Sequence, residues 1–104
     1  MILTTTETIP GKKITEIITI VRGNTIRARH IGADIGANIK NIFGGEIKGY
    51  TKMITEARDE AMQRMVHEAK EVKADAIVNI RFVTAEVMQG AAEVLVYGTA
   101  VKLH

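Results

Sequence analysis

Two pairs of residues could ligate a metal ion, because each joins a histidine to a carboxylate four positions later. His30 and Asp34 form the first pair, and His67 and Glu71 form the second. On a helix this spacing puts both side chains on one face. The first pair is the candidate site for a divalent metal ion, although an electrostatic role for Asp34 in a first helical turn is the simpler interpretation. The second pair is interpreted as a solvated ion pair.

Nothing else in the sequence strengthens the metal hypothesis. The 104 residues include no cysteine and only three histidines. Thiolate-rich zinc sites, iron–sulfur clusters and cysteine nucleophiles are therefore excluded. A structural zinc site needs four ligands, and no third ligand follows either pair at motif spacing.

A glycine-containing stretch, residues 44–51, precedes the most clearly helical part of the chain. Glycine-rich loops that open a helix can bind phosphate, but this stretch lacks the G-x-x-x-x-G-K-[ST] pattern. A connector is therefore the favoured interpretation. If a small ligand binds this chain, the expected contacts are Lys48, Tyr50 and Arg58, which lie in or just after the stretch.

No residue is predicted to be catalytic, and the chain is not expected to be an enzyme. The threonines stand in no nucleophile elbow and are explained by strand propensity. Glu86 and Glu93 flank the last connection, where surface solvation is the favoured role. The alternative function is an enzyme whose active site is assembled between subunits from Tyr50, Arg58 and a carboxylate such as Glu56 or Glu86.

Composition limits the partners that the chain is expected to have. The length fits one domain, residues 1–104, and the net charge is +2. No apolar run is long enough to cross a membrane, and no signal peptide is recognised, so a cytoplasmic location is expected. A nucleic-acid partner is not expected, because the few aromatic residues do not interleave with the basic ones along the sequence.

The elements that must position these side chains follow from periodicity. Residues 51–73 carry an apolar stripe at helical spacing, with Thr51 as the expected N-cap, and residues 31–43 predict a shorter helix. After a short β-prone start, β-branching predicts one strand or a pair of strands over residues 13–27, and strands are also predicted over residues 76–83 and 93–101. The predicted class is α+β, in β-β-α-α-β-β order, with helices on one side of a small, mainly antiparallel sheet.

The strands are apolar on both faces, which is unusual for a small sheet with one solvated side. In the first long strand, strict alternation puts Ile18 and Ile20 on one face and Ile17 and Val21 on the other. Two apolar faces predict that something covers the second one.

Several segments, in order, resemble the YbjQ-like family of small bacterial and archaeal proteins, which carries a heavy-metal-binding label. They are Ile9-Pro10-Gly11-Lys12, Gly44-Gly45, Gly49-Tyr50, Ala57-Arg58, Ala74-Asp75-Ala76-Ile77-Val78 and Gly98-Thr99-Ala100-Val101. The resemblance spans nearly the whole chain. It implies a ring of identical subunits, a homopentamer, and no established activity. Such a ring would cover the second apolar face of the strands, and an isolated subunit is then expected to be only marginally stable. The function expected is thus that of a homo-oligomeric small-ligand-binding, metal-binding or scaffold protein.

One position departs from the family pattern. Relatives usually have glycine at the end of the long helix, where this chain has Lys73. A left-handed conformation at a non-glycine residue, or a different helix end, is therefore expected there.

Overall fold

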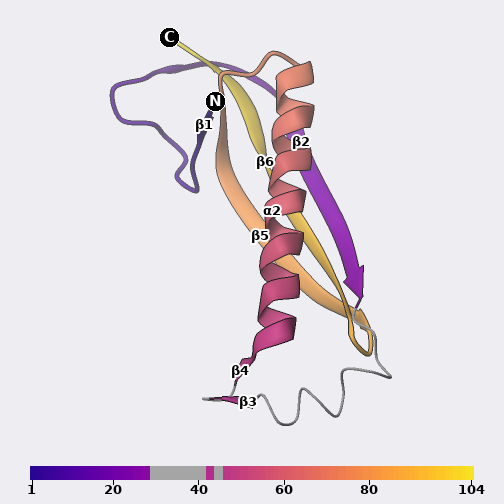
Figure 1. Ribbon diagram of the computed structural model, residues 1–104. Coiled ribbons are helices and arrows are strands. Elements are labelled where there is room, and N and C mark those ends of the chain that lie inside the picture. The colour runs from indigo at the N-terminus through magenta and orange to yellow at the C-terminus, as the bar shows by residue number, and fades with distance from the viewer. Residues whose placement is uncertain (29–41, 44–45) are drawn as a thin grey trace.

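The main sheet has four strands in the order β1-β5-β6-β2, and one long helix packs on one of its faces (Figure 1). The computed structural model describes residues 1–28, 42–43 and 46–104. The strands of the sheet are β1 (Ile2–Leu3), β2 (Ile14–Ala28), β5 (Ala76–Met88) and β6 (Ala91–Leu103). The helix is α2 (Lys48–Glu71), and β3 (Ile42–Phe43) pairs with β4 (Glu46–Ile47).

The predicted α+β class is confirmed, but the predicted element order is not. β1 runs parallel to β5, whereas β5–β6 and β6–β2 are antiparallel, so the sheet is mixed. The helix expected over residues 31–43 lies mostly outside the described residues, and its last two residues form strand β3 instead. The described residues therefore contain one helix, where the sequence predicted two.

The apolar stripe of α2 forms the core, as its spacing predicts. Ala57, Ala61, Met65 and Ala69 are fully buried against β2 and β6. The helix begins three residues earlier than expected, at Lys48. Thr51 consequently lies inside the helix, and the prediction that it is the N-cap is wrong.

Irregularities in two strands overturn the predicted distribution of side chains between the faces. The β2–β6 register shifts between Ile17 and Thr19, so Ile18 packs on the helix-side core with Val21 while Ile20 is 70% exposed. A second register shift, between β5 and β6, lies at Asn79, which adopts φ 56°. Beyond it, Ile80 packs in the core on the helix side of the sheet. An extra residue in one strand inverts the alternation beyond it.

The face of the sheet that turns away from α2, here called the outer face, is only partly covered. The N-terminal segment contacts a small cluster of Ala76, Val78 and Val101 through Ile9. Elsewhere the described structure leaves large apolar side chains exposed. The sequence predicts such side chains on a second apolar face that a partner is expected to cover. On this face they include Ile17, Ile20, Ile26, Val83 and Met88. Phe82, which lies opposite the helix-side Val96, and Val87, at a register shift, are also exposed on β5.

Lys73 ends the long helix in a left-handed conformation, with φ 60°, which confirms one of the two expected outcomes. Its N–H donates to the Lys70 carbonyl, and the Ala74 N–H donates to the Ala69 carbonyl, both at 3.0 Å. These two bonds define a Schellman motif, in which glycine is the usual residue at this position.

Lys73→Gly is expected to raise the free energy of unfolding by about 0.5–1 kcal/mol, because glycine adopts a positive φ without steric cost. Urea denaturation followed by circular dichroism measures the change. Lys70→Gly, within the last helical turn, is the matched control and should lower stability by about 1 kcal/mol. A loss of stability in both variants would contradict the role assigned to Lys73.

Candidate functional site

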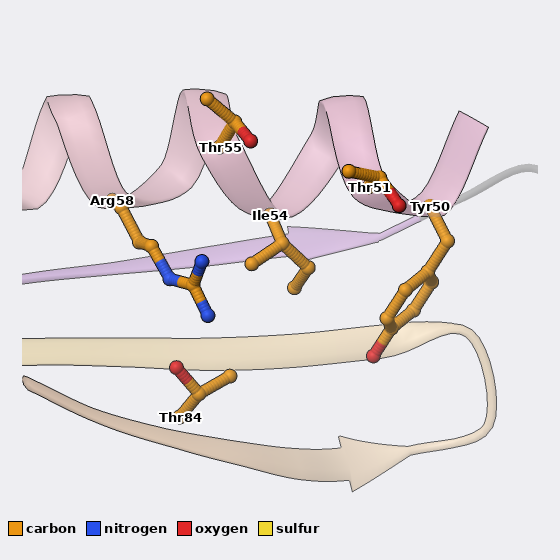
Figure 2. A pocket seen from close by; sticks show the side chains of 6 residues that line it. All are labelled: Tyr50, Thr51, Ile54, Thr55, Arg58 and Thr84. Carbon is orange, nitrogen blue, oxygen red and sulfur yellow. The ribbon is translucent and has the colours of Figure 1, made fainter. Parts of the chain in front are cut away.

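The first turns of α2 and the far half of β5 enclose a pocket of about 270 Å³. Tyr50, Ile54 and Arg58 follow one another at intervals of four residues, so one side of the helix presents all three. Figure 2 shows these side chains directed from the helix toward the β5–β6 hairpin, with Thr84 of β5 directed back toward Arg58. Thr51 and Thr55 complete the lining.

The pocket combines a cation, hydroxyl groups and an apolar floor. Ile54 is buried and Tyr50 is half-buried, whereas Arg58 and Thr84 are exposed. Arg58 has no ion-pair partner within the described residues. A guanidinium beside hydroxyl groups at the start of a helix can donate several hydrogen bonds to a carboxylate or a phosphate.

The structure therefore brings together two of the three residues predicted to contact a ligand. Tyr50 and Arg58 line the same pocket, while Lys48 is the first residue of α2 and its side chain lies outside the described structure. Thr84 was not predicted, because it reaches the pocket only through the position of β5 in the sheet. The spacing of Tyr50, Ile54 and Arg58 was the available signal for the helix side.

The carboxylates proposed for a composite active site lie elsewhere. Glu56 pairs with Arg27 of β2, at 3.7 Å between Oε2 and Nη1. Glu86 lies opposite Ala92 and is exposed, and Glu93 lies opposite Ala85. Since neighbouring positions of a strand point to opposite faces, the antiparallel pairing does not bring Glu86 and Glu93 together.

An ion-pair network fastens α2 to β2 one turn beyond the pocket. Glu60 accepts from Arg27 at 2.5 Å and from Arg64 at 2.6 Å, and the Arg64 Nη1 donates to the Asn24 carbonyl. The hydrogen bond from Arg27, helped by the charge of Arg64, holds the pKa of Glu60 below its ordinary value. Thr25 adds a buried hydrogen bond of 2.7 Å to the Ala57 carbonyl. These contacts fix the helix that carries the pocket.

Glu60→Gln is expected to destabilise the protein at pH 7 and to have a smaller effect at pH 3. A carboxylate with a lowered folded-state pKa contributes stability above its unfolded pKa, about 4.3, and loses it as the pH falls through the folded value. Urea denaturation at the two pH values tests this. Glu68→Gln, on the same helix, is the control. An equal loss at pH 3 would show that Glu60 acts without its charge.

The residues predicted as metal ligands give no support to a metal site. His30 and Asp34 lie outside the described residues. His67 Nε2 pairs with Glu71 Oε1 at 3.0 Å on the exposed side of α2, as expected of a solvated pair. Across residues 1–28 and 46–104, no three histidine, aspartate or glutamate side chains gather as a metal site requires. The described side chains thus do not fit a heavy-metal centre, and the chain has no thiolate to offer a soft metal.

Comparison with known proteins now decides the family. The family model YbjQ_1, described as "Putative heavy-metal-binding", matches residues 1–104. The chain belongs to this family. A "UPF0145 protein" of Psychromonas ingrahamii is 60% identical over 103 residues, which cover 99% of this chain and 98% of the relative. One of Archaeoglobus fulgidus is 57% identical over 104 residues, covering 100% of this chain and 96% of the relative.

A solved structure shares the fold of this YbjQ_1 chain. It is the crystal structure of a protein with unknown function, of the DUF74 family, from Pediococcus pentosaceus. The TM-score is 0.68 at 21% identity, over 100% of this chain and 98% of the other. The resemblance inferred from the sequence is therefore confirmed. Within the described residues, no helix has the length and apolar character needed to cross a membrane.

Proposed function

We propose that this protein is the subunit of a homo-oligomer that binds a small organic anion in the pocket of Tyr50, Arg58 and Thr84. The observation that carries the proposal is the pocket itself, in which an arginine without a described ion-pair partner faces the Thr84 hydroxyl of another element. Binding is better supported than acid–base catalysis, because the described lining holds no carboxylate. A composite active site would need such a group from a neighbouring subunit.

The residues that line the pocket favour an organic anion as the ligand. Arg58 is suited to a carboxylate or phosphate group, since its planar guanidinium donates paired hydrogen bonds. The positive end of the α2 dipole adds to the attraction, because Tyr50 and Thr51 lie within the first turn. Ile54 and the Tyr50 ring offer an apolar surface to the rest of the ligand.

Self-association is supported by the unpaired edges of the sheet. β2 is an edge strand along all 15 residues, and β5 pairs with β1 only at Ala76 and Ile77. The N-terminal segment adds hydrogen bonds to Asn79 and Ile80, after which the described structure offers β5 no second neighbour. Long edges with exposed apolar side chains are templates for pairing with another chain.

A ring joins these two edges without leaving either one open. The β5 edge of one copy, with Phe82 and Val87, meets the β2 edge of the next, with Ile17 and Ile20. Such head-to-tail contacts close when the rotation between copies returns to the start, and five copies are what the family resemblance implies. Thr84 belongs to the unpaired part of β5, so the neighbouring copy would also enclose the ligand pocket.

Arg58→Gln is expected to abolish anion binding at this pocket without unfolding the protein, because Arg58 is exposed and makes no described ion pair. The experiment compares the thermal shift and calorimetric titration of wild type and variant with citrate and with inorganic phosphate. Lys52→Gln, which removes a charge from the same helix outside the pocket, should bind like wild type. Binding that survives in Arg58→Gln, or no binding of either anion by wild type, would overturn the assignment of the pocket.

A further inference from the structure

A row of three side chains crosses the outer face of the sheet and suggests a second binding site. In the strand registers, Arg22 of β2 and Arg81 of β5 both lie opposite Tyr97 of β6. Residues directly opposite on neighbouring strands project on the same face, with Cβ atoms about 5 Å apart. The fold thus places one tyrosine between two arginines of the neighbouring strands, although the three residues are far apart in the sequence.

All three side chains are accessible, and neither arginine is paired with a described carboxylate. Tyr97 is 38% exposed, and both arginines are exposed. Neither arginine has an ion-pair partner within residues 1–28 and 46–104. The Arg81 Nη1 donates to the Thr5 carbonyl at 2.9 Å and to the Ile80 carbonyl at 2.8 Å, which holds its guanidinium beside the sheet.

A pocket adjoins this row. It measures about 320 Å³ and is lined by Arg22, Asn24, Glu93 and Leu95. Asn24 and Leu95 face each other in the next register position, and Leu95 also lies opposite Val83. The site therefore offers an aromatic and aliphatic surface, two cations, one amide and one carboxylate.

We infer that this outer-face site binds a nucleoside phosphate, as a free nucleotide or as part of a single strand. A nucleobase stacks on Tyr97, and phosphate groups pair with Arg22 and Arg81. Asn24 and Glu93 supply donors and acceptors for a base edge or a sugar hydroxyl. An aromatic flanked by basic residues on an open sheet is the arrangement that single-stranded nucleic acids favour.

The test is fluorescence anisotropy with a labelled ten-residue oligothymidylate and a labelled ten-residue oligouridylate, at 50 and 200 mM NaCl. Wild type should bind, and more weakly at the higher salt concentration. Tyr97→Ala should weaken binding about tenfold, while Tyr97→Phe keeps it. Arg22→Gln, an exposed substitution that should leave the fold intact, should weaken binding and reduce the salt dependence.

Competition by unlabelled AMP separates the two sources of the ligand. Displacement of the oligonucleotide by AMP assigns the site to free nucleotides, and failure of AMP to compete assigns it to single strands. Tyr50→Ala and Arg58→Gln alter the pocket on the opposite face and should bind like wild type, so failure here is distinguishable from failure of the proposed anion pocket. No binding by wild type at 50 mM NaCl, or equal binding by Tyr97→Ala and Arg22→Gln, would overturn the inference.

Discussion

Gly23→Ala is expected to lower the free energy of unfolding by about 3 kcal/mol, although it adds only one methyl group. A Cβ atom at Gly23 would lie 2.0 Å from the Ala61 carbonyl oxygen and 2.6 Å from the Met65 nitrogen. Both are backbone atoms of α2, so no side-chain rotation relieves the clash. The helix must move away from β2, which opens the core around Met65 and weakens the contact between Thr25 and Ala57.

Urea denaturation followed by circular dichroism measures the effect of Gly23→Ala. Asn24→Ala is the matched control, because it changes the next residue of the same strand on the exposed outer face. That change should stay within about 0.5 kcal/mol of wild type. A similarly small loss for Gly23→Ala would mean that α2 does not approach β2 as closely as described.

Val87→Lys is expected to raise the dissociation constant between subunits at least tenfold, which corresponds to about 1.4 kcal/mol for each interface. Val87 is 52% exposed on the part of β5 that no described strand covers. A lysine there places a charge on the edge that the neighbouring copy should cover, and edge lysines oppose strand pairing between chains. Because the side chain is already exposed, the fold of the subunit itself should tolerate the change.

Sedimentation velocity over a dilution series compares Val87→Lys with Val72→Lys. Val72 is 37% exposed but follows the end of α2, away from the strand edges. The Val72→Lys variant should therefore associate like wild type. If Val87→Lys sedimented like wild type at every concentration, the β5 edge would not be the subunit contact.

The helix was predictable from the sequence because its core depends on one short-range period. Ala57, Ala61, Met65 and Ala69 recur every four residues, and all four are buried. The faces to which the strand side chains point were not predictable, because a single inserted or left-handed residue inverts the alternation of side chains beyond it. Asn79 in β5 and the shift at Ile17 in β2 leave no mark in the sequence that distinguishes them from regular strand.

The same contrast between helical spacing and strand register decides which residues of the candidate sites were predictable. Tyr50 and Arg58 were predictable because they share a helix face, whereas Thr84 joins them only through the sheet. The row of Arg22, Tyr97 and Arg81 depends on two strand registers at once. Along the sequence the aromatic residues do not interleave with the basic ones. Only the folded sheet brings Tyr97 next to Arg22 and Arg81.

The central claim is that this chain functions as one subunit of a closed assembly. Sedimentation velocity of the wild-type protein at low micromolar concentration tests it most directly. A closed ring of five copies should give a single species with about five times the 11.4 kDa mass of one chain. A monodisperse monomer under these conditions would contradict the claim, since the exposed strand edges and apolar side chains would then have no partner of their own kind.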